Sequence, residues 1–483
     1  MSGRRIYKLA LAGSAVLCLV VAAQFQSAVN RQRMDPDLGL QRVADLGSNA
    51  PPVLAFTTVA LGGFRGLIAN VLWIRANELQ NDGKYFEMVQ LADWITKLEP
   101  TFTQVWTVQA WNMAYNISVK FSDFGDRWRW VRRGIELLRD EGLRYNSKDA
   151  LMYRELGWFF QHKMGQVMDD AHRYYKAEWA REMTNLFGAI RPDFGELLDP
   201  KTPQAKQRVQ LLREKYKMDP VIMKEVDDLY GPLEWRLPDA HAIYWATVGL
   251  KNSKKKDLIT LRRVIYQSML QVVLRGRVLY VQPDGDLITG PNLDLAAKAE
   301  QTYERQFAEE TEMKDAVTRA QRTFLREIVY HFYTYNRIAE ANQYFNLLRE
   351  KFPDLVPPNT NMEEFALSRL NDNIRDMPTD RTKILLAGLI YQHFLSIALD
   401  DDARAAGFER MAQQIYTYHQ ARVAGRGQPL TFPPYEEFKR SILDEMLDPD
   451  RGTLTPELIL RLRTKLGYAP GSEPKQTAAQ SKD

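Results

Sequence analysis

The chain has 483 residues, of which 45% are hydrophobic and 26% are charged, so it carries ample apolar material for a folded core. Its formal net charge of +4 is far from the strongly basic balance of nucleic-acid-binding proteins, and we expect no nucleic-acid partner. The single cysteine, Cys18, lies in the hydrophobic N-terminal segment, which excludes internal disulfides and zinc sites built from cysteines.

The N-terminal segment, residues 1–25, predicts a transmembrane anchor. Two arginines and a lysine flank the apolar run Leu9–Ala23, and a stretch of about 20 apolar residues spans a bilayer. The basic flank favours a cytoplasmic start, so we expect a single-pass inner-membrane protein with a periplasmic or otherwise extracytoplasmic C-terminal body. A signal segment cleaved after Ala23 is the alternative, and it would release the same body outside the cytoplasm.

Two further segments lead into the body of the protein. Residues 26–50 are polar and are interpreted as a linker. The next stretch, Pro51–Ile74, is apolar apart from Arg65 and Asn70, which leaves open whether it contacts or enters the membrane. Because an arginine inside a bilayer costs several kcal/mol, we favour a buried or membrane-surface helix over a second transmembrane helix.

A first helical array is predicted over residues 51–190. If Pro100 ends one unit of the array, Gly83 falls at the turn between two helices, and Tyr85 begins the second helix. Small Ala92 then lies on the inner face of that second helix. The spacing therefore predicts a helix, a turn, a helix and a stop.

Two more units follow in the same array. Trp106 and Ala110 place a large and a small residue on the first helix of one unit. Another unit begins at Tyr153, where Gly157 and Phe160 continue the alternation of small and aromatic residues. Small residues allow two helices to approach closely, and the aromatic residues fill the space between them.

The middle of the chain departs from this pattern. Residues 191–240 are rich in prolines and charges and predict an irregular insertion with one charged helix near Pro203–Lys217. Residues 241–320 predict a helical region with a β-hairpin near 277–289, because apolar residues alternate on both sides of a Pro-Asp-Gly turn. A second charged helix is expected at about 293–320.

A second array with a cap is predicted over residues 321–466. Ala341 lets one helix approach another, Phe345 fills the space between them, and Pro353 ends the helix. The tail, residues 467–483, lacks large apolar side chains apart from Tyr468 and is expected to be disordered.

These motifs resemble the tetratricopeptide repeat (TPR), clearly over residues 69–188 and 322–353. Phrases such as LGGFRGLIANVLWIRANELQNDGKYFEMVQLADWITKLEP and EWRLPDAHAIYWA also resemble a bacterial group of membrane-anchored TPR proteins of unknown function. The resemblance implies an all-α fold, a TPR-like α-solenoid in which helix pairs stack into a right-handed superhelix. It also implies protein binding, and it carries over no catalytic residues and no cofactor.

The residues themselves give little support for chemistry. The six histidines form no His-Glu-x-x-His pair, and the chain has no nucleophile elbow, phosphate loop or dinucleotide fingerprint. We therefore expect no metal, no cofactor and no enzyme. Asp239 and His241 combine an acid and a base, but we interpret Asp239 as part of a helix start, where an acid favours the dipole.

An aromatic and polar run at residues 106–130 is the candidate protein-binding groove. Asn112 and Asn116 are four residues apart, so they share a helix face and could bracket one peptide unit. Trp and Arg are enriched at binding hot spots. The predicted groove residues are Trp106, Trp111, Asn112, Tyr115, Asn116, Arg127 and Arg129. A packed core between helices is the competing interpretation of the same residues.

Three functional hypotheses follow from the sequence. The favoured one is a membrane-anchored scaffold that binds other envelope proteins or peptides. The second is an envelope enzyme acting on cell-wall or lipid-linked sugar, with acids from residues 190–240 converging on a histidine in a deep pocket. The third is a fixed structural component of an export or secretion complex.

Overall fold

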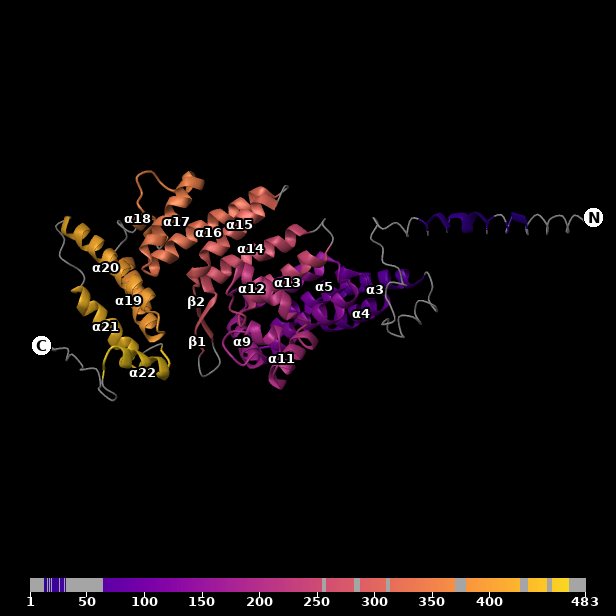
Figure 1. Cartoon of the computed structure of the whole chain (residues 1–483), viewed down its shortest axis with the longest axis horizontal. Coiled ribbons are helices and arrows are strands. Elements are labelled where there is room, and N and C mark those ends of the chain that lie inside the picture. Colours follow the sequence, from indigo (N-terminus) through magenta and orange to yellow (C-terminus); the bar gives the residue numbers. More distant parts are fainter. Residues whose placement is uncertain are drawn as a thin grey trace, which may run out of the picture. The chain divides into compact units, whose positions relative to one another are not determined.

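The computed structural model is mostly helical, with helices packed in pairs and one two-stranded hairpin (Figure 1). It describes residues 13–14, 16, 18, 20–25, 27–29, 31, 64–253, 258–281, 287–309, 313–369, 379–425, 433–449 and 454–468. The chain divides into two compact units, Met1–Trp106 and Thr107–Asp483. No helix in the described part of the chain is long and apolar enough to cross a membrane.

Several predicted segments fall outside the described residues. The linker at 26–50 lies outside them except for residues 27–29 and 31, and the tail does so beyond Tyr468. The predicted anchor is described only in part, so its interpretation stays a prediction.

In the first unit, α3 (Phe64–Asn81) and α4 (Tyr85–Leu98) form a helical hairpin. Gly83 has a φ of +72°, which only glycine adopts without strain, and the predicted turn is confirmed there. The buried side chains of the hairpin include Ala69, Ala76, Leu79, Met88, Ala92 and Ile95. Helix α3 also exposes four apolar side chains, those of Leu67, Ile68, Val71 and Ile74.

The chain enters the second unit through α5 (Thr103–Trp111). The helices that follow are α6 (Phe124–Glu136), α7 (Leu143–Tyr145), α8 (Ala150–Trp158) and α9 (His172–Phe187). Three π-helical stretches extend these helices: η3 (Asn112–Ile117), η5 (Leu137–Gly142) and η6 (Phe159–Met164). A short 3₁₀ turn, η4 (Ser118–Lys120), follows η3.

The insertion contains three helices rather than the one that the sequence predicted. They are α10 (Phe194–Leu198), α11 (Pro203–Glu214) and α12 (Pro220–Tyr230). Prolines occupy the first helical position of α11 and α12, where no backbone N–H is needed. The side chains of Thr202 and Asp219 cap these two helices. The helix predicted near Pro203–Lys217 is therefore confirmed as α11, whereas α10 and α12 were not predicted.

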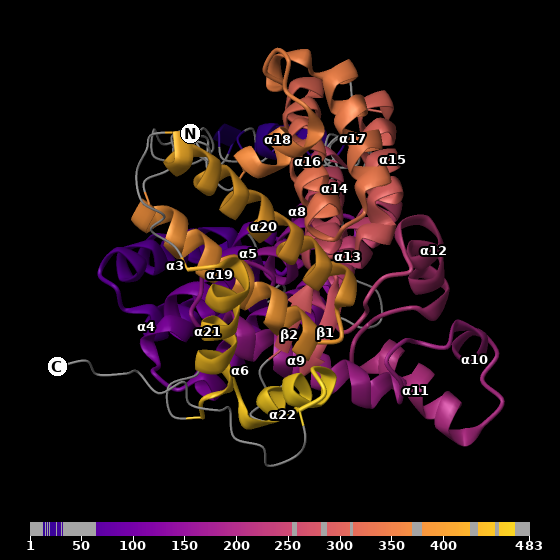
Figure 2. The same cartoon turned by 90° about the vertical axis from the view of Figure 1, so that its left-hand side faces the viewer.

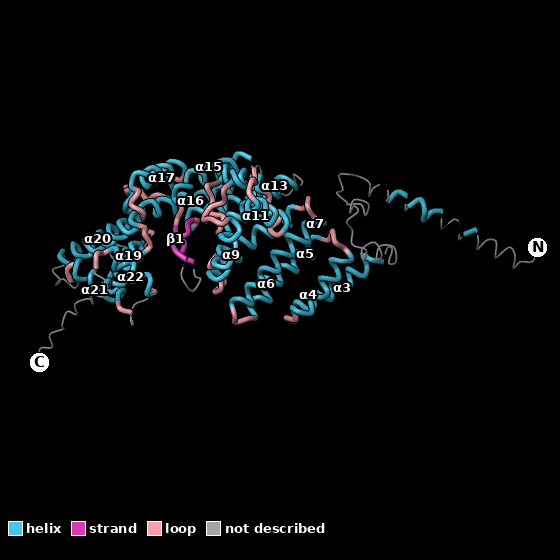
Figure 3. Tube along the Cα trace, turned by 60° about the horizontal axis from the view of Figure 1, so that its bottom comes forward, coloured by secondary structure: helices cyan, strands magenta, loops and turns pink. Residues whose placement is uncertain are grey.

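The next helices, α13 (Pro238–Asn252) and α14 (Leu258–Arg275), pack on each other and on α8. Gly157 of α8 allows this approach, since a Cβ there would lie 3.1 Å from Val264 Cγ1 and 3.4 Å from the Ala242 carbonyl oxygen. The predicted hairpin is confirmed as β1 (Arg277–Val281) and β2 (Leu287–Gly290), which pair antiparallel. Strand β2 packs against α9 and α14. Figure 3 shows the strands of the hairpin in magenta beside α9.

The rest of the second unit is helical. After a 3₁₀ turn, η8 (Leu293–Leu295), the expected helix at 293–320 is replaced by α15 (Ala296–Glu309) and the start of α16 (Lys314–Thr334). Figure 2 shows α16 beside α17 (Ile338–Lys351) and α18 (Met362–Ser368), with which it packs. The remaining elements are η9 (Pro353–Leu355), α19 (Thr379–Ala398), α20 (Asp402–Gly425), α21 (Tyr435–Leu447) and α22 (Pro456–Lys465).

The motif around Ala341 has the structure that its spacing predicts. Ala341 is fully buried at the contact between α16 and α17, and Phe345 is buried against Phe365 of α18. Pro353 follows the end of α17 and opens the 3₁₀ turn η9. The helix pair and its stop are therefore confirmed.

Candidate functional site

Four rings form a continuous ladder across two neighbouring helices of the second unit. Trp111 stacks on Tyr115 with ring centroids 5.2 Å apart, and Trp158 stacks on His162 at 4.5 Å. Tyr115 and His162 join the two pairs, with centroids 5.8 Å apart. We call these four side chains, Trp111, Tyr115, Trp158 and His162, the ring ladder.

The ladder comes from two equivalent places in the chain. In each, a tryptophan ends an α-helix, and the ring that stacks on it lies four residues later in a π-helical stretch. Tyr115 and His162 are 47 residues apart, and so are the first residues of η3 and η6, Asn112 and Phe159. π-Helical turns are rare in proteins overall, but they are often found at functional sites. The correspondence therefore makes the ladder a candidate site.

A hydrogen bond fixes the centre of the ladder. The hydroxyl of Tyr115 lies 3.0 Å from Nδ1 of His162. Burial, and then the nearby Lys163 charge, hold the pKa of His162 below its usual value. Burial raises the pKa of Tyr115, and the carboxylate of Glu155 adds to this effect. Tyr115 and His162 are therefore both neutral at pH 7, and one hydrogen bond joins the Tyr115 hydroxyl to Nδ1 of His162.

A buried ionic network lies directly behind the ladder. The Lys163 ammonium sits 4.9 Å from the ring centroid of Tyr115 and forms a short hydrogen bond to Asp169. Asp169 also accepts the backbone N–H of Ala171 at 2.9 Å and lies 3.4 Å from the guanidinium of Arg127. This network holds the loop after η6 against the ladder.

The pKa values in this network follow from burial and pairing. Burial lowers the pKa of Lys163, and the hydrogen bond to Asp169 opposes that effect. For Asp169, burial alone would raise the pKa, but the hydrogen bonds from Lys163 and Ala171 hold it below its usual value. Asp169 is therefore ionised at neutral pH, and its carboxylate favours the charged form of Lys163.

The structure separates the groove residues that the sequence grouped. Trp111 and Tyr115 belong to the ladder, and 37% of the Trp111 surface is exposed. Asn112 and Asn116 do share a face, but Asn112 is 0% exposed and accepts a hydrogen bond from Asn116 at 3.1 Å. Asn112 therefore has no exposed amide with which to clamp a peptide. The π-helical turn that begins at Asn112 changes which side chains reach the surface.

The other predicted groove residues, Arg127, Arg129 and Trp106, interact with groups of the protein itself. Arg127 donates to the Phe121 carbonyl oxygen at 2.7 Å and pairs with two aspartates, so it is not available to a ligand carboxylate. Arg129 is exposed and pairs with Asp126 at 3.0 Å. Trp106 belongs to the first unit, where it is buried and donates to the Pro100 carbonyl oxygen at 2.8 Å.

Trp158, His162, Lys163 and Asp169 were not among the groove residues predicted from the sequence. One signal could have found the first two, because a tryptophan followed four residues later by a second ring occurs at Trp111 and again 47 residues on. The ionic network had no such signal, since its members come from three separate elements.

A second aromatic cluster of the same unit is fully enclosed. Its centre is His241, which is 0% exposed and lies with its Nε2 2.8 Å from the Trp235 carbonyl oxygen. The rings of Phe160 and Trp179 lie 5.2 Å and 5.0 Å from that of His241. Burial lowers the pKa of His241 to about 4, so the ring is neutral. We call Phe160, Trp179, Trp235 and His241 the buried cluster.

Asp239 lies in the first turn of α13, as the helix-start interpretation predicted, and it also has a specific ionic partner. The residue that precedes α13 is Leu237, and no side chain caps that helix. Asp239 is buried in the first turn and pairs with Arg275 at 3.2 Å. Its charge is thus neutralised by a specific partner, as well as being placed favourably near a helix N-terminus.

Next to this pair lies a buried lysine. Lys176 Nζ is 3.0 Å from Nδ1 of His172. Burial and the charge of Arg275 lower the pKa of Lys176 to about 7, against the partial compensation of Asp239. The pKa of His172 is lowered to about 4, first by burial and then by Lys176.

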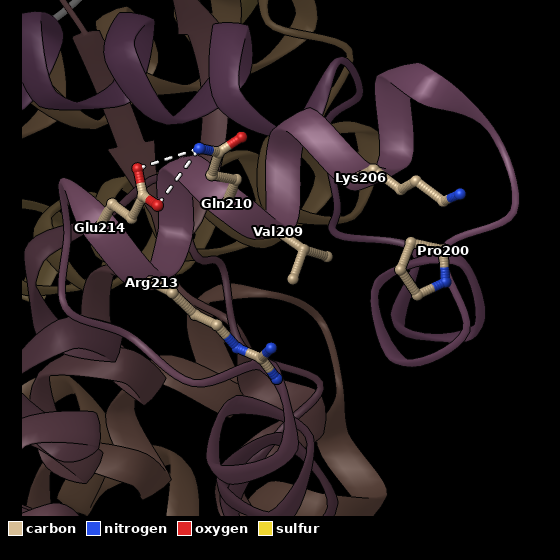
Figure 4. A pocket seen from close by; sticks show the side chains of 6 residues that line it. All are labelled: Pro200, Lys206, Val209, Gln210, Arg213 and Glu214. Carbon is tan, nitrogen blue, oxygen red and sulfur yellow. Dashed lines mark hydrogen bonds between the residues drawn. The ribbon is translucent and has the colours of Figure 1, made fainter.

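Two acids of the insertion, Glu196 and Glu234, pair with arginines rather than with a histidine. Glu196 pairs with Arg208 at 2.8 Å and Glu234 pairs with Arg236 at 2.6 Å, while His241 is enclosed in the buried cluster. Figure 4 shows the shallow groove of about 340 Å³ along α11. Its lining residues are Pro200, Lys206, Val209, Gln210, Arg213 and Glu214. The arrangement predicted for a sugar-cleaving enzyme is thus not formed by these residues.

Comparison with protein families, curated proteins and solved structures found no match. Among the described residues, no group of three or more His, Cys, Asp or Glu side chains is arranged to hold a metal ion. The geometry of the ring ladder is therefore the main guide to function.

Proposed function

We propose that the protein is a helical scaffold that binds other proteins, and that the ring ladder is its binding surface. The observation that carries this proposal is the partly exposed Trp111 at the end of a row of four rings, on a support fixed by hydrogen bonds and ion pairs. Tryptophan and tyrosine supply large contact areas at little cost in side-chain entropy, which makes them frequent hot spots.

The packing of the helices supports a TPR-like solenoid as the framework. Helix pairs such as α3–α4 and α16–α17 have the small residue, the turn and the helix stop that this class of repeat requires. We infer that the pairs stack as a right-handed superhelix, in which first helices present one continuous surface. Trp111 and Trp158 lie on the first helices of two consecutive units predicted from the sequence.

The experiment that tests this function is a crosslinked pull-down with the full chain and its Trp111→Ala variant. Trp94→Ala is the matched control, because Trp94 is also an exposed helical tryptophan, at 48%, but belongs to α4. We expect Trp111→Ala to lose the captured proteins while Trp94→Ala keeps them. Equal recovery by both folded variants would show that the ring ladder is not the binding surface.

We propose a location in the bacterial cell envelope for this scaffold. The proposal rests on the basic flank and the apolar run Leu9–Ala23, which have the charge and length of a membrane anchor. Alkaline carbonate extraction of cell membranes tests it. We expect the chain to stay with the membranes, whereas release into the soluble fraction with a mature start after Ala23 would indicate a cleaved signal segment.

A further inference from the structure

Helix α3 of the first unit carries a group of neighbouring apolar side chains that face solvent. Other apolar residues of α3 are buried in its hairpin with α4. In the exposed group, Leu67 and Ile74 are each 60% exposed and Val71 is 59% exposed. Residues three and four apart on a helix are neighbours on its surface. We call the four exposed side chains, Leu67, Ile68, Val71 and Ile74, the α3 face.

A single exposed leucine elsewhere in the chain gives a useful contrast. Leu460 of α22 is 58% exposed, and the residues three positions away on either side are Glu457 and Arg463. One apolar side chain among charges is ordinary at a protein surface, whereas a contiguous apolar patch marks a site of interaction with a protein or a membrane. The α3 face is a patch, because each of its members has another as a helix neighbour.

The charges around the α3 face limit the kind of partner that it fits. Residues 66–74 contain no charged residue, and neither do residues 51–63, which precede α3 in the sequence. The cations that follow in the hairpin, Arg75, Lys84 and Lys97, are each paired with an acid. Attraction to an anionic partner is therefore weak, and the burial of apolar surface is the main driving force that the α3 face offers.

A lipid bilayer fits these features better than a soluble partner does. A helix that is apolar on all sides is normally buried on all sides, but the apolar part of α3 is buried on one side only. In the membrane-anchored protein proposed above, α3 is tethered close to a bilayer. Tethering raises the effective concentration of the second contact, so an apolar patch of four side chains is sufficient.

We propose that α3 lies on the membrane surface with the α3 face inserted between lipids, and that this contact requires no anionic lipid. The inference rests on the proposed anchoring of the chain by its N-terminal segment. Interfacial helices bury their apolar face about 5–10 Å deep, at the boundary between headgroups and acyl chains.

The hairpin favours a position at the surface over one inside the bilayer. Helix α4 packs along α3 and carries Glu87, Asp93 and Lys97 (Figure 3). Moving the hairpin into the hydrocarbon core would bring these charges with it, and each charge would cost several kcal/mol. The proposal thus decides between the two placements that the sequence left open for this segment, contact with the membrane and entry into it.

The test is electron paramagnetic resonance of the full chain in phosphatidylcholine liposomes. A nitroxide is attached at Val71→Cys or Ile74→Cys, in a Cys18→Ser background that leaves one cysteine to label. Oxygen concentrates in lipid and a nickel chelate stays in water, so their collisions with the label distinguish the two environments. We expect frequent collisions with oxygen, a severalfold loss of collisions with nickel, and a depth of about 5–10 Å.

Leu460→Cys is the matched control, because its side chain is equally exposed but isolated. We expect the label there to collide freely with the nickel chelate. The same lipid signal at position 460 as at 71 and 74 would overturn the proposal, since the α3 face would then have no special role.

The other outcomes identify a different occupant. Few collisions with both reagents at positions 71 and 74 would mean that a protein surface, such as a second copy of the chain, covers the α3 face. Frequent collisions with nickel in a chain that stays with the liposomes would mean that the face is exposed to water. Either result overturns the lipid contact and retains the anchor, whereas a chain that does not associate with liposomes refutes both.

A charge and a lipid change test the driving force. Val71→Asp should restore nickel collisions at a label on Ile74→Cys, while Leu460→Asp should leave them unchanged; circular dichroism shows whether each variant keeps its fold. Adding phosphatidylglycerol to the liposomes should change neither result. A lipid signal that survives Val71→Asp, or that appears only with the anionic lipid, would overturn apolar insertion.

Discussion

The ring ladder and the buried cluster are two aromatic groups of the same unit, and each contains a histidine and tryptophan. In the buried cluster, Trp179 and His241 are enclosed on all sides. In the ladder, Trp111 keeps more than a third of its surface exposed, although its ring is stacked as closely as those of the cluster. Similar residues thus serve packing in one place and present a surface in the other, and exposure separates the two roles.

The largest expected effect concerns the buried cluster. Trp179→Ala should lower the free energy of unfolding by about 3–5 kcal/mol, because it leaves a cavity among four other rings. Trp111→Ala, which removes a partly exposed ring, should lower it by less than about 1.5 kcal/mol. Chemical denaturation of both variants measures the difference. Equal losses would remove the distinction between the cluster and the ladder.

A smaller effect is expected where α8 supports the ladder. Gly157→Leu should cost about 1–3 kcal/mol, since its side chain would collide with Val264 and with the carbonyl oxygen of Ala242. Gly388 of α19 is the matched control, because a Cβ at that exposed position meets nothing within 4 Å. If thermal unfolding shows the same midpoint for Gly157→Leu, Gly388→Leu and the original chain, α8 does not pack as described.

The fold was predictable from the sequence where local rules decide it. Gly83 marked a turn, Ala341 a close helix contact and Pro353 a helix stop, because backbone conformation and side-chain volume act over a few residues. The helix at Pro203 was predicted, but the helix that begins at Pro220 was missed, because a proline can mark irregular structure as well as a helix start.

The site was predictable only in part. Trp111 and Tyr115 were selected from their spacing, but the partners that complete the ladder lie 47 residues away, and their proximity depends on tertiary packing. The π-helical stretch at Asn112 changes the helical periodicity on which the asparagine argument depended. Tertiary contacts, rather than local propensity, therefore decide which amide is buried.

A pH-dependent effect is expected from Lys176, which lies near the buried cluster. Its pKa is about 7 in the folded chain and 10.5 without perturbation, so between these values the unfolded chain binds a proton that the folded chain does not. The free energy of unfolding should therefore rise with pH from 7 to 10.5, by up to about 1.4 kcal/mol per pH unit.

Lys176→Met is the variant that isolates this contribution. It removes the titrating amine while keeping an unbranched side chain, so the rise with pH should be smaller than in the original chain. Chemical denaturation at pH 7, 8, 9 and 10 gives the free energy of unfolding of both proteins. All other titrating groups are the same in the two, so the difference between them reports on Lys176. If the two pH profiles have the same slope, Lys176 keeps an ordinary pKa and is solvated.

The smallest expected change in stability, with the largest change in binding, belongs to the ladder. Replacing Trp111 by a photo-crosslinking phenylalanine analogue, with the same replacement at Trp94 and Trp179, tests directly whether the exposed rings contact a partner. We predict crosslinked proteins from position 111 only. Crosslinks from position 94 but not from 111 would contradict the account, because the partner would then bind the first unit and the ladder would be part of the packed core.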